Sequence, residues 1–312
     1  MKRNNLWQSA LFSLLLLAAA CSADDDGTAL PDGKYPMTFT TTVEGLTVTR
    51  AATADGQWTE GDRIAVQVDS NVKQYKANSG GTSVTLTGMD AGNTFYWQNT
   101  NDITVSAWYC GTGYSSTLPA TWLVQANQSG DGYHQSDFLY APATGIVFNP
   151  SAETANNLPF YHQTAKVVIN IKNAEAATTA DAITSVSIVN MNTSGSYSIP
   201  SGSTTDSWSS HTNKTSITPK DITASNGDIL KTYAALVIPQ DMQGNKFISV
   251  TLSDGNTYYY TPKDNEANLL SGKQYTYDIT VKYGSLEVST VTSPQWTQGG
   301  DVTVNGSEKT SS

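Results

Sequence analysis

The chain has 312 residues and a formal net charge of −10, with 27 acidic and 17 basic residues. A chain this acidic is repelled by phosphate backbones, which excludes nucleic acids as expected partners. Only 14% of the residues are charged, whereas 24 glycines and 16 tyrosines are present, and this composition favours strands and turns over helices.

The first 20 residues have the pattern of a secretory signal peptide. Two basic residues precede an apolar run at 10–20 that is too short to cross a bilayer as a helix. The run ends in "LLAAACSADDD", where small residues before Cys21 resemble the lipobox of bacterial lipoproteins. The acidic residues after it resemble the tag that exports some lipoproteins to the outer surface. We therefore predict a signal peptide at 1–20 and a lipid on Cys21; the alternative is ordinary cleavage near Ala20 with a free cysteine.

A tether and an alternating strand pattern occupy residues 21–50. Apolar residues alternate with polar ones in "YPMTFTTTV" and again in "LTVT" before Arg50, where a small-residue stretch begins that a protease can reach. Either this strand is a permanent edge strand of the fold, or it is removed by cleavage after Arg50. Its apolar positions are Met37, Phe39, Val43, Leu46 and Val48.

Alternating patterns continue along the chain and predict an all-β fold. Apolar residues recur at every second position in 64–68, 103–109, 167–171 and 275–283. The segment "FISVTLSDGNTYYY" contains the Asp-Gly pair of a tight hairpin turn. No stretch shows a convincing apolar stripe at helical spacing. Strands spaced in this way are typical of antiparallel β-sandwiches.

Two polar stretches interrupt the strand patterns. The segment "FNPSAETANNLP" at 148–159 holds two prolines and no alternation. It predicts a boundary between an N-terminal domain at 51–155 and a C-terminal domain at 156–312. A second stretch, 200–221, is rich in serine and threonine and is predicted to be an exposed loop of the second domain.

The sequence contains no pattern of an enzyme. There is no Gly-x-Ser-x-Gly segment, and the three histidines, His134, His162 and His211, have no partners at metal-ligand spacing. We expect no catalytic residue, no metal and no cofactor. His162 is predicted to be a packing or hydrogen-bonded side chain. Cys110 lacks a disulfide partner if Cys21 carries lipid, and we expect it to be a small buried hydrophobe.

Three tryptophans lie close together in the sequence. Trp97, Trp108 and Trp122 fall within one aromatic-rich segment of the first domain. Such rings either pack in the core of a β protein or form a platform on which a sugar ring stacks. The strand patterns around them favour packing.

Four spaced segments resemble the fimbrillin family, the pilins of type V pili and their lipoprotein relatives. In chain order they are "TRAATADGQWTEGDRIAV", "QSGDGYHQSDFLYA", "FYHQTAKVVINI" and "LLSGKQYTYDITVKYGSLEVSTVTSPQW". The order fits the family and the segments extend over almost the whole chain. Ala65 stands where the family often has glycine, and residues 200–221 look longer than the family needs.

The resemblance implies two transthyretin-like β-sandwich domains in tandem and a structural role at the cell surface. Such pilins are exported to the bacterial outer membrane as lipidated precursors. An arginine-specific surface protease then cuts them, here between Arg50 and Ala51, and removes the first strand. A strand from another pilin subunit fills the vacated groove. The donor is expected within 286–312, at Leu286, Val288, Val302 and Val304.

The expected partners are therefore other pilin subunits, outer-membrane lipid through Cys21, the protease, and a receptor or glycan on a host or bacterial surface. We expect the protein on the surface of the outer membrane before processing and in the fimbrium after it. The alternative is a permanently lipid-anchored surface protein, either a fimbrial anchor or a glycan-binding module that uses the three tryptophans. Stalk, tip and anchor roles stay open.

Overall fold

The structure is a computed structural model that describes residues 29–44, 55–149, 156–172, 182–198, 207–223, 228–282, 285–291 and 305–308. Within these ranges the chain consists mainly of strands, which confirms the all-β prediction. The strands expected from alternation are present as β2 (Arg63–Val68), β5 (Ile103–Cys110), β9 (Ala165–Lys172) and β16 (Gln274–Lys282). None of the helical segments in these ranges is long and apolar enough to span a bilayer.

The predicted hairpin is also present. β14 (Ile248–Leu252) and β15 (Thr257–Tyr260) pair antiparallel. At the turn Gly255 has a φ of +85°, a backbone conformation that glycine adopts without a steric penalty.

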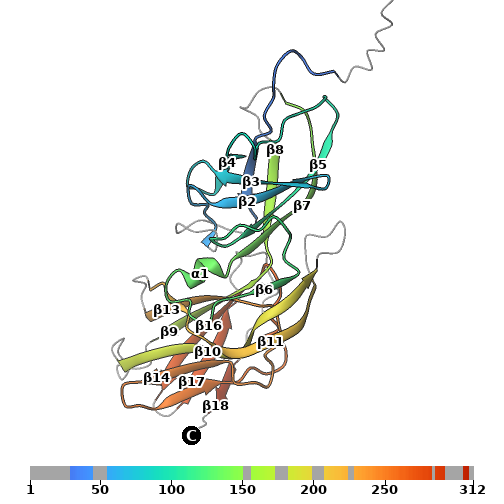
Figure 1. Ribbon diagram of the computed structural model, residues 1–312. Coiled ribbons are helices and arrows are strands. Elements are labelled where there is room, and N and C mark those ends of the chain that lie inside the picture. Colours follow the sequence, from blue (N-terminus) through green and yellow to red (C-terminus); the bar gives the residue numbers. More distant parts are fainter. Residues whose placement is uncertain are drawn as a thin grey trace, which may run out of the picture.

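The strands of the first half close into a barrel (Figure 1). In order around the barrel they are β1 (Phe39–Val43), β4 (Ser83–Gly88), β3 (Asn71–Ala77), β2, β5, β7 (Phe138–Ile146) and β8 (Asn156–His162). All neighbours pair antiparallel except β1 and β8, which run parallel. This half therefore differs from the expected sandwich of separate antiparallel sheets, because β1 joins two strands that would otherwise be sheet edges.

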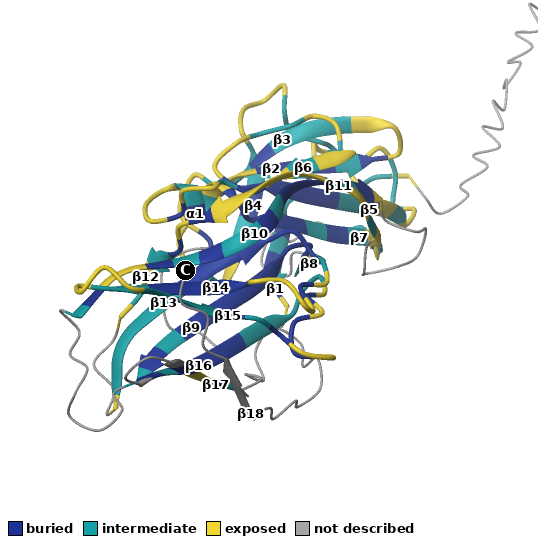
Figure 2. Ribbon diagram, turned by 90° about the horizontal axis from the view of Figure 1, so that it is seen from below, coloured by how far each residue is buried: buried dark blue, intermediate teal, exposed yellow. Residues whose placement is uncertain are grey.

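Two sheets that share one core form the second half. One sheet has the order β11 (Ser207–Ile217), β10 (Ile183–Ser198), β14, β15; the other has the order β12 (Lys220–Asp221), β13 (Ile229–Val237), β9, β16, β17 (Ser285–Val291), β18 (Asn305–Glu308). Buried residues line both sheets (Figure 2), among them Ile169 of β9 and Ile188 of β10. The two sheets thus pack face to face.

The boundary between the halves differs from the predicted one. β8, which the sequence assigned to the C-terminal domain, completes the barrel, and Leu158 and Phe160 are buried in the barrel core. The proline-containing stretch at 148–159 therefore begins after β7 and ends within β8, so it does not separate two domains. In the opposite direction, β6 (Thr121–Leu123) of the first half pairs with β10.

The prediction of a loop at 200–221 was wrong for residues 207–217 and 220–221, which are strands. Residues 207–217 form β11, an edge strand paired antiparallel with β10. Most side chains of β11 are exposed, so polar residues stand on both faces. The alternation that identifies a half-buried strand is therefore missing from this sequence.

The core of the second half gives a direct test of the sheet packing. Ile169 is fully buried on β9, between β13 and β16. Replacing it by alanine removes three carbons and leaves a cavity, so we expect Ile169→Ala to lower the free energy of unfolding by about 2–5 kcal/mol. The control is Thr212→Ala at an exposed position of β11. We expect it to change the free energy of unfolding by no more than about 0.5 kcal/mol. Chemical denaturation measures both; equal effects would contradict the assigned core.

Candidate functional site

β1 is paired on both of its sides. Phe39 lies opposite Leu86 of β4 and opposite Asn156 of β8. Just past the strand, Glu44 donates its backbone N–H to the carbonyl of Phe160 (2.8 Å). β1 is therefore an interior strand, which corrects the interpretation of this segment as an edge strand.

The inner face of β1 fills a slot in the barrel core. Phe39 and Thr41 are fully buried, and Met37 and Val43 are nearly so. The ring of Phe39 lies 5.6 Å from the ring of Tyr75, whose hydroxyl donates a hydrogen bond to the carbonyl of Met37 (3.1 Å). Burying a large apolar side chain stabilises a fold by about 1.5–3 kcal/mol. A barrel without β1 would expose the slot and leave two strands with unpaired backbone groups.

The C-terminal candidates fall into two groups. Leu286 and Val288 lie on β17 with 2% and 4% of their surface exposed, and β17 pairs with β16 and β18. These two residues thus belong to the core of their own sheet. The predicted residues that lie outside the described ranges are Cys21, Leu46, Val48, Arg50, Ala51, Val302 and Val304.

The three tryptophans do not share a surface. Trp97 is buried in the barrel core, 5.5 Å from the ring of Phe148. Trp108 is buried in a different cluster, at the junction of the halves. Trp122 stacks on Phe138 at 4.9 Å and is only partly buried. These contacts fit the packing interpretation, because Trp97 and Trp108 are buried in different clusters and the three rings form no common platform.

Aromatic rings also connect the two halves. Phe138 of β7 lies 4.7 Å from Tyr197 of β10, which in turn lies 5.2 Å from Trp208 of β11. Cys110 is buried in the same cluster, as predicted, and burial raises the pKa of its thiol to about 12. Because the thiolate is the reactive form, this cysteine is inert at neutral pH.

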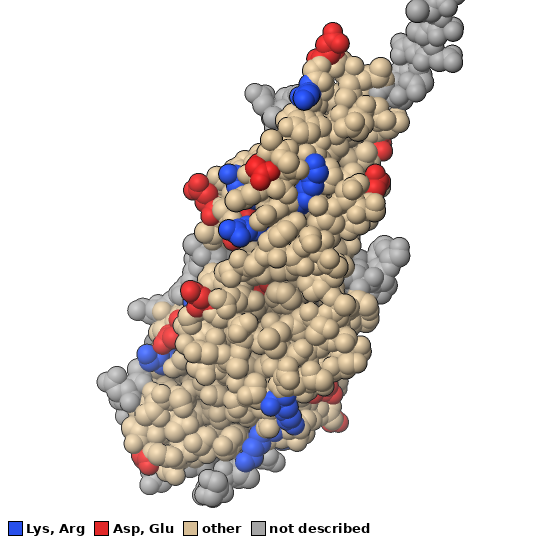
Figure 3. Space-filling view, viewed as in Figure 1, with Lys and Arg blue, Asp and Glu red and all other residues tan. Residues whose placement is uncertain are grey.

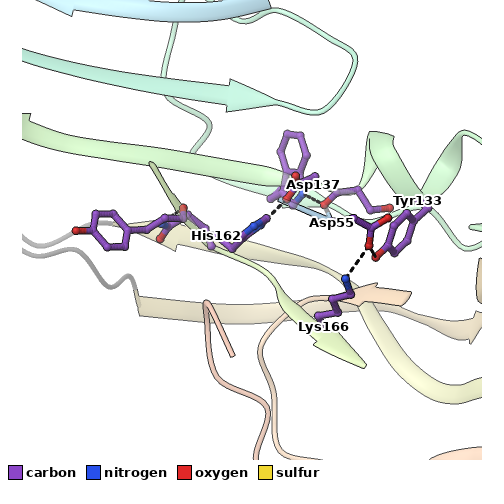
Figure 4. A network of polar contacts seen from close by, with 9 residues as sticks. Asp55, Tyr133, Asp137, His162 and Lys166 are labelled. Carbon is purple, nitrogen blue, oxygen red and sulfur yellow. Dashed lines mark hydrogen bonds and ion pairs between the residues drawn. The ribbon is translucent and has the colours of Figure 1, made fainter. Parts of the chain in front are cut away.

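A buried ion pair crosses the same junction (Figure 4). The Lys166 ammonium on β9 lies 2.8 Å from a carboxylate oxygen of Asp55, and these side chains are only 7% and 11% exposed. The hydroxyl of Tyr133, on the short helix α1 (Gly132–Gln135), donates to the same oxygen (3.1 Å). One carboxylate from the segment between β1 and β2 thus contacts both α1 and the second half.

The environment of Asp55 determines its protonation. Burial alone would raise the pKa of Asp55, but the Lys166 charge, the hydrogen bonds from Lys166 and Tyr133, and the charge of Lys220 outweigh that effect and lower it below 3.8. Asp55 is therefore ionised at neutral pH. A buried pair of this kind costs desolvation energy, so its main effect is to fix one arrangement of the halves.

The position of Tyr133 depends on Gly132. A Cβ atom on Gly132 would lie 1.9 Å from the carbonyl oxygen of Asn127, so the backbone packs too closely for any other residue. Sequence reasoning missed α1, because four residues are too few to show a helical period. The Asp-Gly pair of "DGYH" indicates only a turn at this position.

A second buried polar pair lies beside the first. Nδ1 of His162 at the end of β8 is 2.9 Å from a carboxylate oxygen of Asp137, which confirms the predicted hydrogen-bonded histidine. Burial raises the pKa of the nearby Asp62, an effect opposed by hydrogen bonds from Thr59 and Tyr109 and reinforced by the Asp137 charge. Among the described residues, no three His, Cys, Asp or Glu side chains are grouped closely enough to hold a metal ion.

Most of the sequence matches the model of a protein family. A family model described as Fimbrillin-like matches residues 49–296. The chain belongs to the fimbrillin-like family. The match begins after β1 and before Asp55, so β1 lies outside the part of this fimbrillin-like protein that the family model covers.

Solved structures resemble the fimbrillin-like chain in fold. A candidate cell adhesion protein from Bacteroides uniformis has a TM-score of 0.62 at 20% identity, and a second from Bacteroides ovatus has 0.62 at 21%; each comparison covers 86% of this chain and 100% of the other. A third, from Bacteroides fragilis, has 0.51 at 12%, covering 86% and 99%. At these identities the likeness concerns the fold. No curated protein sequence matches the chain.

The junction ion pair predicts a defined pH dependence. Asp55→Asn is expected to lower the free energy of unfolding at pH 7 by about 3 kcal/mol, because it leaves the Lys166 ammonium buried without its counter-charge. A carboxyl whose folded pKa is depressed stabilises the fold fully above its unfolded pKa, near 3.8, and loses that effect as the pH falls through the folded pKa. Denaturation of both proteins between pH 7 and pH 3 should therefore show the difference shrinking below about pH 4.

The control for this measurement is the exposed Asp102. Asp102→Asn should leave the stability at pH 7 within about 0.5 kcal/mol of the wild type. A difference between Asp55→Asn and wild type that stays constant down to pH 3 would contradict the assigned role of the ion pair.

Proposed function

We propose that the protein is a structural subunit of a surface fimbria that polymerises by strand exchange. In this proposal it is exported as a lipoprotein with lipid on Cys21 and is cut between Arg50 and Ala51. The observation that carries the proposal is the position of β1: it is an interior strand with a fully buried face, yet it precedes Arg50 and the family-matched region. Removing such a strand creates a binding site for another.

The physical drive for assembly is the vacated slot. Loss of β1 leaves β4 and β8 with unpaired backbone groups on either side of apolar pockets that Phe39 and Val43 had filled. An extended segment with alternating apolar residues restores both the hydrogen bonds and the packing. Because the donated segment and the slot are different surfaces, the contact is head-to-tail and continues into a filament.

We place the donor at the end of the chain, in the part that includes Val302 and Val304. Leu286 and Val288 are buried in the core of the second half, so withdrawing them would damage the subunit that donates. The partners in this proposal are neighbouring pilin subunits, outer-membrane lipid before cleavage, an arginine-specific surface protease, and a surface receptor or glycan. Membership of the fimbrillin-like family supports a role in a cell-surface appendage.

Cleavage at Arg50 is tested by the N-terminus of the native protein. After the signal region the chain has only two arginines, Arg50 and Arg63, which provides a matched control. We expect protein from shed surface material to begin at Ala51 without lipid, and Arg50→Ala to remain full-length and lipidated. Arg63→Ala should be processed like the wild type. Intact mass and N-terminal sequencing give the result; a wild-type chain that exists only with acylated Cys21 at its start would contradict cleavage.

Strand exchange is tested separately by locking β1 in place. Thr40 of β1 lies directly opposite Thr85 of β4, and opposite residues have Cα atoms about 4.5–5.5 Å apart, within the range of a disulfide. The double variant Thr40→Cys, Thr85→Cys, when oxidised, should be cut at Arg50 but should not assemble. Reduction should restore assembly. The buried Cys110 does not interfere.

The single variant Thr85→Cys is the control for the lock and should assemble like the wild type under both conditions. Filament formation is followed by electron microscopy and by the ladder of sizes on a gel. Equal assembly of the oxidised double variant and the wild type would show that β1 does not leave.

A further inference from the structure

A hollow of about 500 Å³ opens on the second half of the molecule. Three segments build it: β11, the residues after β13, and the loop that leads into β16. Its polar and aromatic wall consists of Trp208, His211, Gln240, Asn268, Ser271 and Lys273. It uses none of the residues of β1 or of the junction ion pair. A volume of this size is within the range of small-molecule sites, about 300–1,000 Å³.

The chemistry of the wall is selective. It offers an indole, an imidazole, two amides, a hydroxyl and an ammonium group. None of the described residues that line it is acidic, although the chain has 27 acidic residues. Asp241 follows the wall residue Gln240 but does not line the hollow. Its carboxylate accepts a hydrogen bond from the backbone N–H of Gln243 (2.9 Å). The wall therefore favours a neutral or anionic ligand.

The indole of Trp208 is held rigidly. Its Nε1 donates to the carbonyl of Gln163 (3.1 Å) and to the hydroxyl of Ser271 (3.0 Å). The ring packs against Gly195, where a Cβ atom would approach Trp208 Cε3 to 3.0 Å. The ring is only partly buried. An aromatic side chain that lines the hollow and is fixed in this way is a preorganised surface for stacking.

The backbone beside His211 departs from ordinary strand geometry. Ser210 and Asn213 have φ values of +50° and +59°, left-handed conformations that asparagine adopts readily and serine rarely. Between them, Nε2 of His211 lies 2.8 Å from the carbonyl of Pro239. That contact makes Nε2–H the donor and leaves Nδ1 as an acceptor. The irregular backbone coincides with a shift in the register between β11 and β10, between Ser194 and Ser196, and bulges of this kind are common next to functional sites.

The neighbouring wall is also fixed. The side-chain amide of Gln240 accepts hydrogen bonds from the backbone N–H and the side-chain amide of Asn192, and donates to the carbonyls of Asn192 and Ile238. Asn268, in contrast, is exposed at the opening. The hollow thus has a rigid interior and a polar side chain at its edge.

We propose that this hollow binds a saccharide ring that carries a carboxylate. The apolar face of the ring stacks on Trp208, the hydroxyls hydrogen-bond with Asn268 and the imidazole of His211, and the carboxylate pairs with the Lys273 ammonium. This binding does not depend on cleavage at Arg50 or on polymerisation. It would give each subunit along a fimbria its own contact with acidic glycans.

The test is a titration of the mature full-length protein, followed by saturation-transfer NMR and calorimetry. Glucuronic acid and N-acetylneuraminic acid are the probes. Glucose is the matched ring without a carboxylate, and lactate is a carboxylate without a ring. We expect saturable binding of at least one acidic sugar, and binding at least about tenfold weaker for glucose and lactate, because each lacks one of the recognised features.

Lys273→Met should weaken binding of the acidic sugar by about tenfold or more, because it removes a charge-assisted contact. The control is Lys214→Met, which removes the same charge from an exposed position of β11 outside the hollow and should bind like the wild type. Asn268→Ala, at the exposed edge, should give a smaller loss. Circular dichroism verifies that each variant is folded.

Four results would overturn the proposal. They are no saturable binding of either acidic sugar, equal binding of glucose, equal binding of lactate, and an unchanged affinity in Lys273→Met. Equal binding of lactate would indicate a carboxylate site that also accepts a peptide C-terminus.

Discussion

The parallel pairing of β1 with β8 is the contact on which the first half of the molecule depends. With β4 on its other side, β1 closes the barrel and brings Phe39 into the core. β8 ends at His162, and β9 of the second half begins at Ala165. The strand that completes the barrel is therefore directly followed by a central strand of the other half, and closure of the barrel also fixes where the second half starts.

The junction then holds the two halves in one arrangement. Apolar contacts run through Phe138, Tyr197 and Trp208, while the ion pair between Asp55 and Lys166 supplies a directional contact beside them. The apolar rings contribute most of the stability, because burying charges costs energy that the pairing only partly returns. The ion pair contributes specificity, since a shifted arrangement would leave a buried charge unpaired.

Sequence reasoning identified the strands that bury one face and alternate, such as β2, β9 and the hairpin of β14 and β15. It failed where that pattern is absent. β11 is an edge strand with exposed side chains on both faces, and β8 begins within a proline-containing stretch that resembles a domain boundary. The crossing of β6 onto β10 and the closure of the barrel are long-range pairings that no local pattern encodes. Asp55 and Lys166 likewise become partners only through the fold.

The position of β1 also has a kinetic consequence. β1 is the first strand of the described chain, and its parallel partner β8 lies far along the sequence, so the barrel closes only through a contact between distant segments. Pairings of this kind form slowly, because the entropy of closing a long loop opposes them. A chain that later lost β1 would no longer hold the strand that guided its own closure. Each subunit would then fold once, before processing. A processed subunit that unfolded could not refold from its own chain alone.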